Sequence, residues 1–226
     1  MKITYLGQNG LLIESKNSKI IVDPYLSDSV AKIEPENTRR QPVDESFFSV
    51  KPTMVVITHT HADHYDEETL DKLLSGGGCV LFAPPSVFEK AKKRYKNVNC
   101  VFFRSGTSYT AEGIVFRAVK AEHSDTEAVG VIISCEGKDL YITGDTLYSE
   151  QVFESLPENL NCYAVFLPIN GRGNNMNAAD AARFLKRIKY RFAVPMHFGL
   201  FDDLTGCELS CENAVIPEIY KEIMLK

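Results

Sequence analysis

The chain has 226 residues, of which 44% are hydrophobic and 24% charged, and its net charge at pH 7 is −5. This length suits one domain with a sizeable core, so we expect a single domain over residues 1–226. The acidic balance offers no attraction for nucleic acid or an anionic membrane, and the sequence has neither a signal-peptide run nor an apolar stretch of about 20 residues. We therefore expect a cytoplasmic protein that acts on a small molecule, as a monomer or a homo-oligomer.

The first half of the chain predicts strands followed by helices. Short apolar and β-branched runs between turn residues predict strands over 2–6, 10–14, 19–22, 54–57, 79–83 and 98–103. A helix is expected over 66–74, where Asp66 supplies a carboxylate at the N-terminus. A second helix is expected over 86–95, where Ser86 and Glu89 have the spacing of a capping box.

The second half continues this alternation. Strands are predicted over 114–121, 129–135, 139–143, 163–169 and 192–195. Helices are predicted over 178–188, capped by Asn177 with Asp180 three residues on, and over 215–224. Strands that alternate with helices along the chain are typical of an α/β fold.

The segment 24–52 has no periodic pattern. A long irregular segment in a compact domain is more often functional or mobile than idle. Its basic patch contains Arg39 and Arg40. These side chains are either ordinary solvated loop charges, or one of them reaches over the site and binds a carboxylate or phosphate of the substrate through a bidentate contact.

The stretch Thr58–Asp66, with the sequence THTHADHYD, holds three of the five histidines and two acids. It lies between a predicted strand and a predicted helix, where several side chains can be aimed at one point. Imidazole and carboxylate are the groups that bind divalent zinc, manganese or iron. In an extended stretch His59 and His61 project to the same side, while Asp63 and His64 can face a second point close by. The spacing predicts two metal sites roughly 3.5–4 Å apart, in preference to a polar surface turn.

The string His59-Thr60-His61-Ala62-Asp63-His64 resembles the H-x-H-x-D-H signature of the metallo-β-lactamase superfamily. Matching positions follow in the superfamily's order along nearly the whole chain: Asp23, His123, Asp145 and His197. All five histidines are thereby used. The resemblance implies an α/β fold of the αββα type, a four-layer sandwich known as the metallo-β-lactamase fold.

The resemblance also implies the roles of these residues. One ion would be held by His59, His61 and His123, the other by Asp63, His64 and His197, and Asp145 would bridge both. The two divalent ions would be zinc or manganese, or else iron, and would lower the pKa of a shared water so that hydroxide attacks the substrate. Asp63 would also place this nucleophile or pass a proton to the leaving group. Asp23 would orient a ligand histidine or the loop that carries the ligands.

Within the superfamily the chain most resembles the branch that includes L-ascorbate-6-phosphate lactonase. The shared features are the segments 39–42, 144–148 and 177–180, together with 194–197. We therefore expect hydrolysis of a lactone or other ester of a small metabolite, with or without a phosphate group. The glycine-rich loop 168–176 is either the segment that recognises the substrate, through Arg172 and Asn174, or a plain flexible connection.

Two other classes of function stay open. The first is a phosphodiesterase or nuclease that uses the same two-ion site. The second is a di-iron redox protein, or a metal-binding relative without catalytic activity. Cys207 and Cys211, four residues apart, are expected to be free thiols instead of a disulfide or a metal-binding pair.

Overall fold

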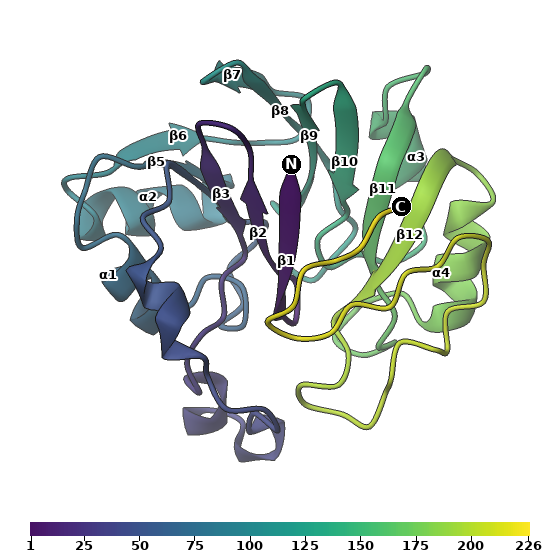
Figure 1. Ribbon diagram of the computed structural model, residues 1–226, viewed down its shortest axis with the longest axis horizontal. Coiled ribbons are helices and arrows are strands. Elements are labelled where there is room, and N and C mark those ends of the chain that lie inside the picture. The colour runs from purple at the N-terminus through teal and green to yellow at the C-terminus, as the bar shows by residue number, and fades with distance from the viewer.

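The computed structural model describes residues 1–226 and contains two six-stranded sheets (Figure 1). The first sheet has the order β1 (Lys2–Gly7), β2 (Gly10–Glu14), β3 (Lys19–Val22), β4 (Met54–Val56), β5 (Val80–Ala83) and β6 (Asn99–Phe102). The second has the order β12 (Lys189–Met196), β11 (Asn161–Pro168), β10 (Lys138–Ile142), β9 (Val129–Cys135), β8 (Ile114–Lys120) and β7 (Ser108–Ala111). In both sheets antiparallel hairpins come first in the chain and parallel strands follow.

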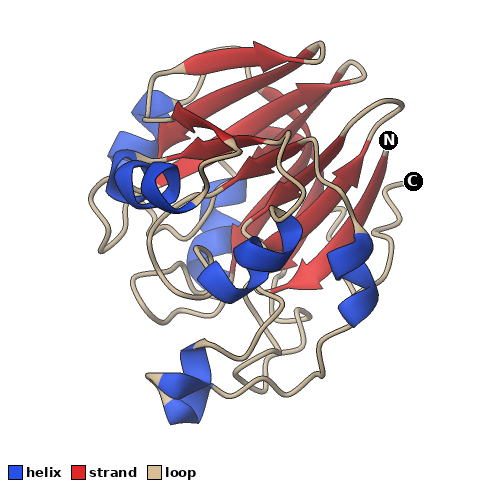
Figure 2. Cartoon of the chain, turned by 90° about the vertical axis from the view of Figure 1, so that its left-hand side faces the viewer, coloured by secondary structure: helices blue, strands red, loops and turns tan.

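Helices cover the outer faces of both sheets (Figures 1 and 2). The first sheet carries α1 (Glu67–Leu73) and α2 (Pro85–Arg94), and the second carries α3 (Glu150–Ser155) and α4 (Ala178–Leu185). Side chains alternate between faces along a strand. Ile20 and Val22 of β3 therefore lie in the core between the sheets, whereas Ile21 packs toward the helices. These layers confirm the predicted αββα four-layer sandwich.

Every strand predicted from the sequence is present, with ends shifted by a few residues at most. Two predicted helix caps are also confirmed: the Asp66 carboxylate accepts from the backbone N–H of Glu68 at 3.3 Å, and the Asn177 side chain accepts from that of Asp180 at 2.9 Å. The strand β7 and the helix α3 were not predicted. None of the helices has the length and the apolar character that crossing a membrane requires.

The predicted capping box of the second helix is wrong. The helix begins one residue earlier, at Pro85, and its N-cap is Pro84, which has no side-chain hydrogen bond. Ser86 therefore lies inside the first turn, and its hydroxyl donates to the Asp125 carboxylate at 2.8 Å. The same carboxylate accepts the backbone N–H of Thr60 at 3.0 Å, so Asp125 joins the start of α2 to the histidine-rich loop.

The predicted helix over 215–224 does not form. This segment runs as irregular chain between β1 and β12, the edge strands of the two sheets (Figure 1). Val215 donates its backbone N–H to Ala193 of β12 at 2.8 Å, and Tyr220 and Ile223 donate theirs to Tyr5 and Ile3 of β1 at 2.7 and 2.8 Å. Unpaired groups of edge strands need partners, and the segment supplies them. Cys207 and Cys211 form no disulfide.

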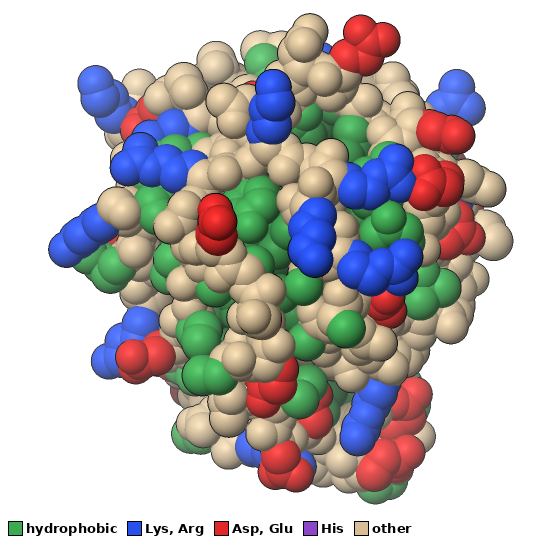
Figure 3. Space-filling model, turned by 90° about the vertical axis from the view of Figure 1, so that its right-hand side faces the viewer, with side chains coloured by type: hydrophobic (Ala, Val, Ile, Leu, Met, Phe, Trp, Pro, Cys, Tyr) green, Lys and Arg blue, Asp and Glu red, His purple; other side chains and the backbone are tan.

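The face that carries α4 and β12 shows basic side chains interspersed with acidic ones and no histidine (Figure 3).

The segment 24–52 lies at the lower end of the molecule in Figure 1, beside the loop that follows β12. It contains three short 3₁₀ turns, Val30–Lys32, Pro35–Asn37 and Glu45–Ser49, and no longer element. This end of the sandwich holds the histidines.

Candidate metal centre

All seven predicted metal ligands lie together, in loops that follow strands of both sheets. The loop after β4 supplies His59, His61, Asp63 and His64, and the loops after β8, β10 and β12 supply His123, Asp145 and His197. Three groups of residues each bring their ligand atoms within 4.8 Å of one another: His59, His61 and His123; Asp63, His64 and His197; and His59, His64 and Asp145. The first two groups are the two predicted sites, and the third connects them.

The donor atoms of this cluster fit divalent metal ions. The Nε2 atoms of His59 and His64 are buried and form no hydrogen bond; His59 has no partner there, and the nearest carboxylate to His64 is that of Asp145, at 3.4 Å. A buried polar atom without a partner is costly, and a bound cation removes that cost. His197 Nε2 lies 3.2 Å from a carboxylate oxygen of both Asp63 and Asp145, so these three side chains converge on one point. Imidazole and carboxylate together form a donor set suited to zinc, manganese or iron.

Asp23 supports the cluster from behind. It is fully buried at the end of β3, and its carboxylate accepts from the backbone N–H and the hydroxyl of Thr58, at 2.8 and 2.6 Å. It also accepts from Nδ1 of His64 at 2.9 Å, so Nε2 of that ring is left to face the other ligands. A carboxylate in this position fixes the tautomer and orientation of a metal-binding histidine.

Three amide side chains of the site were not predicted from the sequence. Gln8 Nε2 donates to Asp63 at 2.9 Å, Asn175 Nδ2 donates to Asp145 at 2.8 Å, and Asn9 donates to the other oxygen of Asp145. Gln8 and Asn9 lie in the turn after β1, which the fold brings beside the loop after β12, because the His197 N–H donates to the Gln8 carbonyl at 2.8 Å. In the sequence they resemble ordinary turn residues, and no local signal marks them.

The ionisable groups of the cluster shift one another's pKa. Burial lowers the pKa of His59 well below its ordinary value, and repulsion by His64 adds to this effect. Burial also lowers the pKa of His64 and His197, but the surrounding carboxylates, foremost Asp145, outweigh this effect. The net result is a raised pKa for both, which for His197 is about 10. Burial likewise opposes ionisation of Asp145, and the two histidines hold its pKa well below the usual range.

These shifts predict how metal binding depends on pH. At pH 7 the metal-free protein holds protons on His64 and His197, and a histidine must lose its proton before it binds a metal. We expect binding to release protons and the affinity for zinc to rise at least about tenfold per pH unit between pH 6 and pH 8. Calorimetric titration in two buffers of different ionisation enthalpy measures the protons released. An affinity independent of pH would contradict the prediction.

The metal-free protein should show the opposite trend in stability. Because the folded-state pKa of His197 is raised to about 10, its stabilising contribution is complete below about pH 6.5 and is lost as the pH rises toward 10. Metal-free protein should therefore unfold at lower denaturant concentration at pH 9 than at pH 7, while zinc-loaded protein should show no such loss. Urea unfolding at both pH values checks this.

The cluster opens into a cavity of about 550 Å³. His61, Asp63, Asp145 and His197 line it, so these candidate metal ligands are accessible to a small molecule. The walls come from the segment 30–37, the loop 170–175 and residues 201–202. Arg172 is the one lysine or arginine in this lining. Asn174 is not part of it; its backbone carbonyl accepts from Nδ1 of His123 at 3.2 Å.

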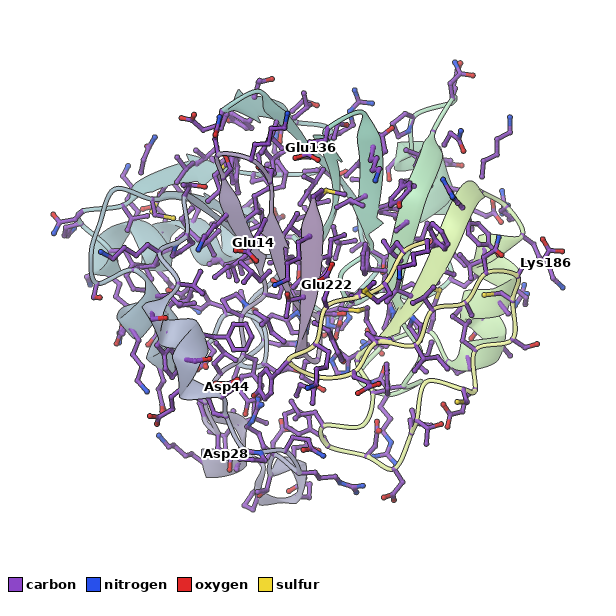
Figure 4. The ribbon with its side chains drawn as sticks, in the orientation of Figure 1. Glu14, Asp28, Asp44, Glu136, Lys186 and Glu222 are labelled. Carbon is purple, nitrogen blue, oxygen red and sulfur yellow. The ribbon has the colours of Figure 1, made fainter.

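Arg39 and Arg40 do not line the cavity. The Arg39 guanidinium donates to the Tyr25 carbonyl at 2.9 Å, the Tyr220 hydroxyl at 2.7 Å and the Gln41 carbonyl at 3.2 Å. Its backbone N–H donates to Asp28 at 3.0 Å, at the end of the molecule opposite Glu136 (Figure 4). Arg40 forms an ion pair with Asp203. Both arginines therefore connect the segment 24–52 to the C-terminal part of the chain.

The Arg39→Ala variant distinguishes an anchoring role from substrate binding. Loss of the guanidinium removes three hydrogen bonds, and we expect the free energy of unfolding to fall by about 2 kcal/mol. Because Arg39 lies outside the cavity, KM should change less than twofold or so, within the range of a surface substitution. Urea unfolding and steady-state kinetics measure both effects, with Arg104→Ala as an exposed control. A KM raised tenfold with unchanged stability would return Arg39 to the substrate site.

The fold and the histidine–aspartate cluster define a protein of the metallo-β-lactamase type. Residues 2–197 match the family model described as the Beta-lactamase superfamily domain. The chain therefore belongs to this superfamily, which confirms the resemblance expected from its motifs.

Known proteins of similar sequence and structure agree with this assignment. A UPF0173 metal-dependent hydrolase from Pyrococcus furiosus is 26% identical over 99% of this chain and 92% of its own length. A possible metal-dependent hydrolase from Veillonella parvula has a TM-score of 0.78 at 17% identity, covering 99% of this chain and 98% of that one. An isothiocyanate hydrolase from Delia radicum gut bacteria has a TM-score of 0.76 at 18% identity, covering 99% of both chains.

Proposed function

We propose that this protein is a metal-dependent hydrolase that uses two divalent ions to cleave a lactone or other ester of a small metabolite. The observation that carries this proposal is the seven-ligand cluster beside a cavity, in which the buried Nε2 of His59 has no partner. The name of the Pyrococcus furiosus relative, a metal-dependent hydrolase, supports it.

The two ligand groups would each hold one ion, with Asp145 shared between them. Zinc or manganese bound there would act as a Lewis acid that acidifies water and polarises the substrate carbonyl. Asn9 and Asn175 each donate to one Asp145 oxygen, so they hold this carboxylate in a fixed orientation. Asp23 does the same for His64.

Asp63 is the residue of this set best placed to move a proton. It lines the cavity, and its side chain is 15% exposed, whereas that of Asp145 is 4% exposed. Gln8 donates to its Oδ2 atom and fixes the carboxylate. We assign Asp63 the transfer of a proton from the attacking water to the leaving group, and Arg172 the binding of a polar group of the substrate.

A hydrolysis screen of protein loaded with zinc or with manganese tests this function. The substrates are simple lactones, carboxylic esters and bis-(p-nitrophenyl) phosphate, and the expected result is turnover of a lactone or ester that stops when the metal is removed with a chelator. Turnover of the phosphodiester alone would instead establish a phosphodiesterase on the same centre. An iron-dependent optical spectrum without hydrolysis would point to a redox protein.

A further inference from the structure

One wall of the cavity is apolar. The only hydrophobic residues of the lining are Val30, Ile33, Ala62 and Phe201; Val30, Ala62 and Phe201 belong to one packed cluster, and Ile33 follows Val30 in the same 3₁₀ turn region. Ile33 is 70% exposed, more than any other large hydrophobic side chain of the protein. Exposure of a large apolar side chain at the rim of a substrate cavity is informative, because the same side chain would be stabilised by burial against a ligand.

This apolar wall is held rigidly from behind. Phe201 packs edge-on against the buried Tyr25 ring, with centroids 5.7 Å apart. Val30 donates its backbone N–H to the Tyr25 hydroxyl at 3.3 Å, and the Ile33 N–H donates to the Val30 carbonyl at 3.0 Å. Arg40 donates its backbone N–H to the Leu200 carbonyl at 3.0 Å. This bond joins the segment 24–52, which carries Val30 and Ile33, to the loop after β12, which carries Phe201. The backbone that carries this wall and the Phe201 ring are therefore preorganised for binding.

Charges beside the wall disfavour an anion there. Glu34 follows Ile33 and Asp202 follows Phe201, and both line the same cavity. Their carboxylates are fixed: Glu34 accepts from the Asn37 side chain at 2.7 Å, and Asp202 accepts from the Gly199 and Leu204 N–H groups at 2.8 and 3.0 Å. A phosphate or carboxylate against this wall would be repelled by both. The cation Arg172 comes from another segment, the loop 170–175.

From this arrangement we propose that the wall binds an uncharged apolar group of the substrate, such as an alkyl chain, and that Ile33 determines the specificity for it. This inference rests on the proposed function and narrows it to esters or lactones with an apolar substituent. The polar part of such a substrate lies toward the candidate metal ligands and Arg172.

A series of γ-lactones with linear 4-alkyl chains from methyl to hexyl tests the proposal. In zinc-loaded protein kcat/KM should rise by up to about fourfold for each added CH₂ that is buried. Ile33→Ser should reduce this increment to less than about twofold, because a short polar side chain offers little apolar surface. Ile33→Leu should keep it. The matched control is Met224→Ser, which removes a 51% exposed apolar side chain outside the cavity.

A binding measurement separates the wall from the hydrolytic function. Protein with ¹³C-labelled isoleucine methyl groups is titrated with the same lactones, with and without zinc, and the Ile33 signal is identified by its loss in Ile33→Leu. Titration shifts of this signal that give a lower Kd for each longer alkyl chain would support binding of the chain at the wall, even if no lactone is hydrolysed. Turnover that does not depend on chain length, together with an unshifted Ile33 signal, would overturn the proposed role of the wall. The proposal that the protein is a hydrolase would still stand. Faster turnover of a 4-carboxyalkyl lactone than of its alkyl counterpart would also overturn the role of the wall.

Discussion

The Asp145→Ala variant should lose at least about 10³-fold in kcat/KM, the largest effect on activity that the structure predicts. The Asp145 carboxylate lies 3.4 Å from His64 Nε2 and 3.2 Å from His197 Nε2, and it belongs to the group that connects the two proposed metal sites. Its removal takes away the shared negative charge, so the variant should retain fewer ions per chain. Steady-state kinetics and elemental analysis of the same preparation measure the two effects.

Two further variants make this test specific. Asp145→Asn keeps the volume of the side chain and removes its charge, and it should lose nearly as much activity as Asp145→Ala. The control is Asp139→Ala: Asp139 lies on β10, the strand that precedes the Asp145 loop, at the end away from the cluster, where its carboxylate accepts from Ser134. This control should keep the activity of the parent. Circular dichroism checks that each variant is folded, and a folded Asp145→Asn protein with full activity would refute the bridging role.

The Asp23→Ala variant should show the largest loss of stability. In the unchanged protein the Asp23 carboxylate is fully buried and accepts three hydrogen bonds, two from Thr58 and one from His64. Without it these donors are buried without partners, and we expect the free energy of unfolding to fall by about 4 kcal/mol. Metal affinity should also drop by roughly 10- to 100-fold, because the His64 ring loses its orienting contact.

Thermal unfolding of the metal-free variant and zinc titration measure these losses separately. For a chain of this size about 4 kcal/mol corresponds to a Tm lower by roughly 10 °C. Glu222→Ala, which changes an exposed residue of the C-terminal segment, is the control and should leave both quantities unchanged (Figure 4). Unchanged Tm and unchanged zinc affinity in Asp23→Ala would show that the buried carboxylate does not support the centre.

The metal cluster was predictable from the sequence because its signal is local. His59, His61, Asp63 and His64 stand within six residues, just after a short apolar, β-branched run that predicts a buried strand. His123, Asp145 and His197 each follow a strand, and the ends of strands in such sheets converge at one edge. The order of strands and helices along the chain predicted only an α/β fold, and the four-layer arrangement was expected from the resemblance to the superfamily.

Features that depend on contacts between distant segments were not predictable. Apolar residues spaced as in a helix over 215–224 also suit a segment that pairs with edge strands, and only the fold decides between them. The sequence shows that Arg39 is charged but not that its guanidinium turns toward Tyr25 and Tyr220. Gln8 and Asn9 belong to the site because the fold places the turn after β1 beside the loop after β12, a contact that the sequence alone does not show.

The most direct test of the central claim is the number of metal ions that one chain holds. Protein purified without added metal is loaded with zinc or manganese, dialysed, and measured by elemental analysis against protein concentration. Two ligand groups joined by Asp145 predict two ions per chain, and one or fewer in Asp145→Ala. A wild-type chain that retains no ion after loading, or only one under all conditions, would contradict a two-metal centre.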